Sequence, residues 1–172
     1  MPPIATAQRP TVLIVDDDPG SVALLCAALR SSYDVRACTN GLDALGIIGS
    51  DEPPELILLD VMMPGINGLD LCRKLHDSRA RRDIPIMFVS VLGEPEDECR
   101  GLALGAVDYL RKPVNPAVVR ARVQLQLDVK HARDTLTRRL EALEAKLSAQ
   151  NNRQFDGEEL IPRRVPALEH EE

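Results

Sequence analysis

Five short apolar runs, each followed by a helix-like pattern, constrain the fold of this chain more than any other feature. The runs lie at residues 11–16, 35–38, 56–60, 84–90 and 107–110. The first, third and fourth are almost continuously apolar, as expected of strands that are buried on both faces of a parallel sheet. The second and fifth are shorter and more polar, which is typical of strands at the edges of a sheet.

The segments between the runs have helical patterns, which span residues 21–30, 41–48, 68–76, 95–104 and a long stretch that begins at Pro116. This alternation predicts an α/β fold with a doubly wound, five-stranded parallel sheet and right-handed crossovers. The expected strand order is 2-1-3-4-5, the flavodoxin-like order. The composition agrees, because 44% of the residues are apolar but only 2% are aromatic. Aliphatic side chains must therefore fill the core.

The domain boundaries are predicted from where the alternation begins and ends. We expect an N-terminal tail over residues 1–10, the α/β domain over 11–128, a helical extension over 129–150 and a disordered tail over 151–172. The extension contains no Gly or Pro and continues the last helix of the domain. The predicted fold is therefore an α/β domain with an extended C-terminal helix.

The long helix carries a regular apolar seam. Its members are Leu125, Val129, Ala132, Leu136, Leu140, Leu143 and Leu147. Their spacings of 4, 3, 4, 4, 3 and 4 residues form a coiled-coil-like heptad pattern with one extra four-residue step, a stutter. The seam predicts a parallel homodimer through the last helix. The alternative is a solvated single helix, which would leave all these apolar side chains exposed.

Charge and cysteine content exclude several other classes of protein. The formal net charge of −6 argues against binding to a nucleic-acid backbone, and the arginines of residues 79–82 and of the long helix are interpreted as a solvated surface. The four cysteines form no Cys-x-x-Cys pair, so we expect buried thiols rather than a metal site. No signal peptide and no apolar run of ~20 residues are found, so we expect a cytoplasmic protein.

Polar side chains follow four of the predicted strands. Asp16 and Asp17 come after the first, Asp60 ends the third, Ser90 ends the fourth and Lys112 follows the fifth. Ligands of open parallel sheets bind outside the carboxyl ends of the strands, where the winding reverses. With the order 2-1-3-4-5 this point lies between the first and third strands, so the carboxylates should converge there.

Three clustered carboxylates repel one another unless a cation lies among them. Mg²⁺ prefers oxygen ligands and is often held by one or two carboxylates together with a phosphate group. A lysine and a serine beside such a site supply a positive charge and a hydroxyl for phosphate oxygens. The pattern therefore predicts a Mg²⁺-dependent phosphoryl-transfer site.

Four segments, VLIVDDDPG, LLDVMMPGINGLDLCRKL, PIMFVSVLGE and GAVDYLRKPV, resemble the receiver domains of two-component response regulators in order and spacing. The resemblance covers about residues 11–125. It implies that Asp60 is the phosphoacceptor, which takes a phosphoryl group from a histidine kinase or a phosphotransfer protein. It also implies a signalling domain rather than an enzyme, with loss of its own phosphoryl group as its one hydrolytic reaction.

The resemblance also implies a role for each residue around Asp60. Asp17, Asp60 and the backbone carbonyl of Met62 would bind Mg²⁺ directly, and Asp16 would bind the same ion through water. Lys112 would pair with the phosphate.

The same resemblance implies a conformational switch. Ser90 would move to bind the phosphoryl group, and Tyr109 would rotate into the space that it leaves. The output would be a changed face on the fourth helix, fifth strand and fifth helix, read by dimerisation or by a partner. Tyr109 taken alone is more often a half-buried aromatic residue at the sheet edge, and its switch role is implied only by the resemblance.

Backbone roles are predicted for several residues near the site. Asp18, followed by Pro19, is interpreted as the cap of the first helix. The Lys112–Pro113 bond is expected to be cis by resemblance to the family. Gly65 and Gly68 are expected to serve the turn after Asp60 through permissive backbone angles.

Two further questions stay open at this point. The segments look similar to receivers that precede diguanylate cyclase or cyclic-di-GMP phosphodiesterase domains, so the chain is either a stand-alone receiver or the input part of a larger regulator. A different class is a Mg²⁺-dependent phosphatase with an aspartyl nucleophile, for which Asp16 and Asp18 have the required spacing. Pro19 and the motif around Asp60 favour the receiver.

Overall fold

Five parallel strands form one sheet in the order β2-β1-β3-β4-β5, in a computed structural model that describes residues 9–91 and 95–155. The strands are β1 (Thr11–Val15), β2 (Asp34–Cys38), β3 (Leu56–Leu59), β4 (Ile86–Ser90) and β5 (Asp108–Arg111). Strands β1, β3 and β4 are buried almost throughout, whereas β2 and β5 are partly exposed at the edges. The predicted fold and strand order are confirmed.

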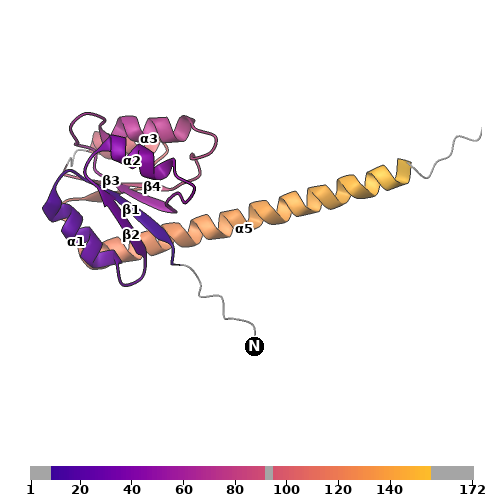
Figure 1. The fold of residues 1–172 in the computed structure, drawn as a ribbon, viewed down its shortest axis with the longest axis horizontal. Helices are drawn as coiled ribbons and strands as arrows, with labels where there is room; N and C mark the ends of the chain where they lie inside the picture. The colour runs from indigo at the N-terminus through magenta and orange to yellow at the C-terminus, as the bar shows by residue number, and fades with distance from the viewer. Residues whose placement is uncertain (1–8, 92–94, 156–172) are drawn as a thin grey trace, which may run out of the picture. The chain divides into compact units, whose positions relative to one another are not determined.

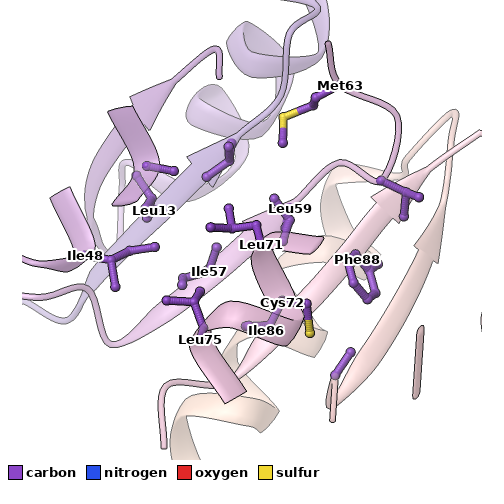
Figure 2. Packing of buried hydrophobic residues seen from close by; sticks show 14 of the residues in the cluster. Leu13, Ile48, Ile57, Leu59, Met63, Leu71, Cys72, Leu75, Ile86 and Phe88 are labelled. Atoms are coloured by element: carbon purple, nitrogen blue, oxygen red, sulfur yellow. The ribbon is translucent and has the colours of Figure 1, made fainter. Parts of the chain in front are cut away.

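Helices cover both faces of this sheet (Figure 1). They are α1 (Pro19–Leu29), α2 (Gly41–Ile48), α3 (Gly68–Asp77), α4 (Pro95–Ala103) and α5 (Pro116–Phe155). One apolar cluster packs α2 and α3 against the sheet, and Figure 2 shows its side chains converging from Ile48, Leu71 and Leu75 onto the strands. A second cluster packs α1 and the first turns of α5 against the opposite face through Leu25, Val119 and similar residues.

Side-chain caps fix where three of the helices begin. Asp18 accepts hydrogen bonds from the backbone N–H groups of Gly20 and Ser21, and Pro19 stands at the first helical position. Asn40 and Asn67 cap α2 and α3 in the same way. The interpretation of Asp18 as a helix cap is confirmed.

Several element ends differ from the sequence prediction by one or two residues, and the start of β4 differs for a physical reason. β1 and β3 end at Val15 and Leu59, one residue before Asp16 and Asp60. Both aspartates therefore lie just beyond the strands, where their side chains are directed by the following loops. β4 starts at Ile86 rather than Ile84, because Pro85 has no N–H for the ladder.

The chain divides into two compact units, which end and begin at His131 and Ala132. Helix α5 continues through this point to Phe155, five residues beyond the predicted end of the extension at residue 150. The rest of the predicted tail, and most of the N-terminal tail, fall outside the described residues. Among the described helices, none is both long enough and apolar enough to cross a membrane.

The cysteines are free, but they are not all buried as expected. Cys72 is buried, Cys26 and Cys38 are partly buried, and Cys99 is exposed on α4. Burial raises the pKa of the Cys38 and Cys72 thiols to about 11. The expectation was wrong for Cys99, because α4 turns this position away from the sheet.

Candidate functional site

The carboxyl ends of β1 and β3 bring two aspartates together. The strands are direct neighbours, with Val15 paired to Leu59. The backbone N–H of Asp60 donates to the carbonyl of Val15 over 2.8 Å. This hydrogen bond fixes the start of the loop that carries Asp60 beside the end of β1, where Asp16 follows.

A cluster of three carboxylates results. One oxygen each from Asp16, Asp17 and Asp60 lies within 4.8 Å of the others. The residues Asp16 and Asp60 are only 1% and 5% exposed, whereas Asp17 is exposed. The sequence prediction that these carboxylates converge is therefore met, and the cluster has one side open to water.

Lys112 joins the two buried carboxylates. Its Nζ atom lies 2.7 Å from Oδ2 of Asp16 and 2.7 Å from Oδ2 of Asp60. Partial burial by itself lowers the pKa of Lys112, but the hydrogen bonds to Asp16 and Asp60 and their negative charges outweigh it and raise the pKa above its ordinary value. The ammonium group is therefore held in its charged form between two anions. The Lys112–Pro113 peptide bond is cis, as expected.

Backbone and hydroxyl donors occupy other oxygen atoms of the cluster. Asp16 accepts from the backbone N–H of Asp18 through Oδ1 (3.0 Å) and from the hydroxyl of Ser21 through Oδ2 (2.5 Å). Asp60 accepts from the backbone N–H of Met62 through Oδ1 (3.0 Å). Sequence reasoning missed Ser21, because its contact depends on how Asp18 starts α1 and no motif signals it.

Ser90 lies on β4, the neighbour of β3, and Tyr109 lies on β5, the edge strand beside β4. Ser90 is fully buried at the end of β4, and its backbone carbonyl accepts from the N–H of Lys112 over 2.9 Å. Tyr109 on β5 is 8% exposed, and its ring lies 6.2 Å from that of Phe88, at an angle of 54°. Tyr109 is thus a buried core residue here rather than a half-buried one.

The loop after Asp60 depends on two glycines for different reasons. Gly65 has a φ of +80°, so the expectation of a permissive backbone angle is confirmed there. Gly68 has no positive φ, so that expectation was wrong for it. A Cβ atom at Gly68 would lie 2.1 Å from the backbone oxygen of Asp60. Gly68 is required because α3 starts in direct contact with the backbone of Asp60.

The charges of the site fit a divalent cation. Three carboxylates and one ammonium group leave a formal charge of −2 in a cluster that is mostly buried. Such a charge is costly unless a cation compensates it. The side-chain atoms that could bind a cation here are all carboxylate oxygens, which are ligands that Mg²⁺ prefers.

A pocket of about 400 Å³ lies beside Lys112. Its walls come from the start of α1, the residue after β4 and the loop after β5, and apolar residues such as Leu24, Val91 and Val114 contribute much of its surface. Val91 and Leu24 are exposed to 66% and 42%. A partner that approaches the carboxylates can therefore contact apolar surface next to the charged cluster.

Comparison with known proteins agrees with this geometry. Residues 12–124 match the response regulator receiver domain family. The chain is 40% identical over 129 residues to the response regulator PleD of Caulobacter vibrioides, which covers 74% of this chain and 28% of PleD. It is 35% identical over 137 residues to a Vibrio cholerae protein named "Probable cyclic di-GMP phosphodiesterase", which covers 80% of this chain and 31% of that protein.

A solved structure shows the same fold. A Chloroflexus aurantiacus protein named "putative response regulator" superposes with a TM-score of 0.67 and 34% identity, over 70% of this chain and 99% of the other. The chain spans less than a third of the two curated relatives named above. With the family match over most of its length, the chain belongs to the receiver domains of two-component response regulators, which are phosphoacceptor signalling domains.

Proposed function

We propose that Asp60 is the phosphoacceptor and that it takes its phosphoryl group from a phosphohistidine of a histidine kinase or phosphotransfer protein. The observation that carries this proposal is the contact of one Asp60 oxygen with Lys112, next to two further carboxylates. Asp16 is less suitable as a nucleophile, because Lys112 and Ser21 both bind its Oδ2 atom and Asp18 binds Oδ1.

The proposed step is a displacement at phosphorus. An oxygen of Asp60 forms a bond to the phosphorus atom while the phosphorus–nitrogen bond of the phosphohistidine breaks. The electron pair of that bond stays on the imidazole nitrogen. The leaving group is a neutral imidazole when its other ring nitrogen carries a proton, and otherwise it takes a proton from water. Lys112 stands where it can bind an oxygen of the transferred group, and its raised pKa keeps it charged.

We propose Asp16, Asp17, Asp60 and the backbone carbonyl of Met62 as the Mg²⁺-binding groups. When bound, Mg²⁺ supplies positive charge that offsets the repulsion between the carboxylates and the incoming phosphoryl group. The proposal is supported by the formal charge of −2 in the described cluster.

The proposed switch uses Ser90 and Tyr109. Ser90 and Lys112 are linked through the backbone, so a phosphoryl group that attracts both would pull on the loop after β5. Tyr109 packs on the ring of Phe88, two residues before Ser90 on β4. These contacts connect Ser90 with β5 and the loop after it. We propose that a change at Ser90 alters the face of α4, β5 and α5, which is read by dimerisation through the last helix or by a partner.

The cellular setting is also a proposal. Receivers act on the cytoplasmic side, where their kinases transfer phosphate, so we propose a cytoplasmic location and no turnover of an external substrate. The name of the V. cholerae relative assigns a phosphodiesterase activity to that protein and not to this chain. We propose an output domain of this type only if this receiver is the input part of a longer protein. A phosphatase that uses Asp18 is disfavoured, because both oxygens of Asp18 cap α1.

A small-molecule phosphodonor tests the proposal. The purified chain is incubated with acetyl phosphate and Mg²⁺, and the intact mass is measured. We expect one added phosphoryl group in the wild type and none in Asp60→Ala. The matched control is Asp43→Ala, which removes an exposed aspartate and should be phosphorylated like the wild type. Phosphorylation of Asp60→Ala at the wild-type rate would contradict the proposal.

A further inference from the structure

We infer that α5 pairs with α5 of a second copy of this chain as a parallel, in-register coiled coil, in which Arg139 of each copy binds Glu144 of the other. The inference rests on the homodimer proposed above and gives it an orientation and a register. It does not depend on phosphoryl transfer to Asp60.

The apolar seam of α5 is exposed in the single chain. Its large members, Leu125, Val129, Leu136, Leu140, Leu143 and Leu147, are each 56–61% exposed. They lie on one continuous helix that runs from Pro116 to Phe155. A solvated helix gains nothing from so regular an apolar row, whereas a second helix with the same row covers it.

The spacing of the seam defines two heptad frames that meet at Leu136. In the first frame Val129 and Leu136 take a positions and Ala132 a d position. In the second frame Leu140 and Leu147 take a positions and Leu143 a d position. The four-residue step from Leu136 to Leu140 joins the two frames as a stutter.

Charged residues flank the second frame where two helices would meet. Arg139 takes a g position and Glu144 the next e position. In a parallel in-register pair, a g residue faces the e residue five positions later on the other helix. Arg139 of one copy then meets Glu144 of the second copy, and symmetry makes this contact twice. In the first frame, Asp128 and Arg133 repeat the arrangement with opposite signs.

Neither charge of this pair is explained by the single helix. Residues three or four positions apart are neighbours on a helix surface. Around Arg139 these positions hold Thr135, Leu136, Ala142 and Leu143, and none of them is acidic. Around Glu144 they hold Leu140, Glu141, Leu147 and Ser148, and none of them is basic. The pair is complementary only between two helices.

Antiparallel pairing brings like charges together instead. In that orientation g residues face g residues and e residues face e residues. Pairing Leu136 with Leu140 places Arg139 beside Arg139. Pairing Leu140 with Leu143 places Arg139 beside Lys146. Pairing Leu143 with Leu147 places Glu144 beside Glu144. Every antiparallel register that matches these leucines is therefore repulsive, which favours the parallel one.

A charge-swap series in the full chain tests the inference. The variants are Arg139→Glu, Glu144→Arg and the double swap, and the control is Arg138→Glu, which makes the same change at the neighbouring outward position. The dissociation constant of the dimer is measured by sedimentation equilibrium, and helix content by circular dichroism. Each single swap turns two attractive contacts into two repulsive ones, so we expect the dissociation constant to rise about tenfold or more.

The double swap restores opposite charges across the parallel interface. We expect it to return close to the wild-type dissociation constant, as should an equimolar mixture of the two single variants. Arg138→Glu should leave the constant unchanged. A monomeric wild type, a trimer, or equal effects at Arg138 and Arg139 would overturn the inference. So would tighter association of Arg139→Glu, which the antiparallel pairing of Leu140 with Leu143 predicts because it places residue 139 beside Lys146.

The same measurement separates this inference from the proposed function. Asp60→Ala should show the same charge-swap pattern, because the helix contacts do not involve Asp60. If the wild type cannot be phosphorylated but shows this charge-swap pattern, the phosphoacceptor role alone is refuted. If the wild type is phosphorylated at Asp60 but the charge swaps do not change its dissociation constant as expected, the coiled coil alone is refuted.

Discussion

The carboxylate cluster at the ends of β1 and β3 and the apolar seam of α5 differ in whether their side chains have partners. In the cluster, buried Asp16 and Asp60 share Lys112 at 2.7 Å and also accept hydrogen bonds from nearby backbone groups. Along the seam, leucines such as Leu140 and Leu147 are about 60% exposed, at 61% and 60%. The polar groups are thus buried and the apolar groups exposed, which is the reverse of an ordinary fold.

Each region is therefore incomplete in its own way. The carboxylate cluster has an excess of negative charge, which a cation would reduce and a phosphoryl group would increase. The seam has an excess of apolar surface that a second helix can cover. Substitutions in the carboxylate cluster should change the stability or chemistry of the single chain, and substitutions in the seam should change the association of two chains.

The largest contrast is expected between a leucine of the core and a leucine of the seam. Leu71→Ala creates a cavity in the cluster under α3 and should lower the free energy of unfolding by about 3 kcal/mol. Leu140→Ala should change it by less than about 0.5 kcal/mol at concentrations where the chain is monomeric. Urea unfolding of both variants in dilute solution measures this difference. Equal losses would show that α5 already buries its seam within one chain.

A glycine beside Asp60 should be nearly as sensitive. Gly68→Ala places a methyl group against the backbone oxygen of Asp60, so we expect the free energy of unfolding to fall by about 2–3 kcal/mol. The control is Gly46→Ala on α2, where a Cβ atom would meet no other atom within 4 Å. That variant should be stabilised by about 0.5–1 kcal/mol, because alanine favours a helix. Thermal unfolding of both variants separates contact from helix propensity. A tolerated alanine at position 68 would contradict the account of this turn.

Mg²⁺ should stabilise the folded chain through the carboxylate cluster and should not affect the contacts of the seam. At a concentration 100 times its dissociation constant, a bound ion adds about 2.7 kcal/mol to the free energy of unfolding. Asp17→Asn should weaken Mg²⁺ binding about tenfold, which removes about 1.4 kcal/mol of this gain. Without Mg²⁺ it should be neutral or stabilising, since it removes one of three clustered negative charges.

Denaturant titration with and without MgCl₂, at constant ionic strength, measures both effects. Asp51→Asn, at an exposed aspartate outside the cluster, is the control. An equal Mg²⁺ response in wild type and Asp17→Asn would remove Asp17 from the proposed ligands.

The smallest effect is expected at Ser21. Ser21→Ala removes the hydroxyl that donates to Oδ2 of buried Asp16, so the free energy of unfolding should fall by about 1 kcal/mol. Ser21→Thr keeps the hydroxyl and should restore most of the loss. Chemical denaturation without Mg²⁺ measures this. If the alanine and threonine variants are equally stable, the hydroxyl does not hold Asp16.

Much of this protein follows from the sequence itself. The alternation of apolar strands and helical segments predicts the sheet and its order, because strands that are buried on both faces require helices on both sides. The strand ends also predict that Asp16, Asp60 and Lys112 meet. The α5 seam is equally readable, since its heptad spacing depends on the order of residues along one helix.

Other features were decided only by the tertiary structure. The sharing of Lys112 by two carboxylates, the hydroxyl of Ser21 on Asp16 and the contact of Gly68 with the backbone of Asp60 join atoms from separate elements. Periodicity records which face a residue takes, but not the distances between elements that pack independently. Those distances depend on how α1, α3 and the loop after β5 pack around the ends of β1 and β3.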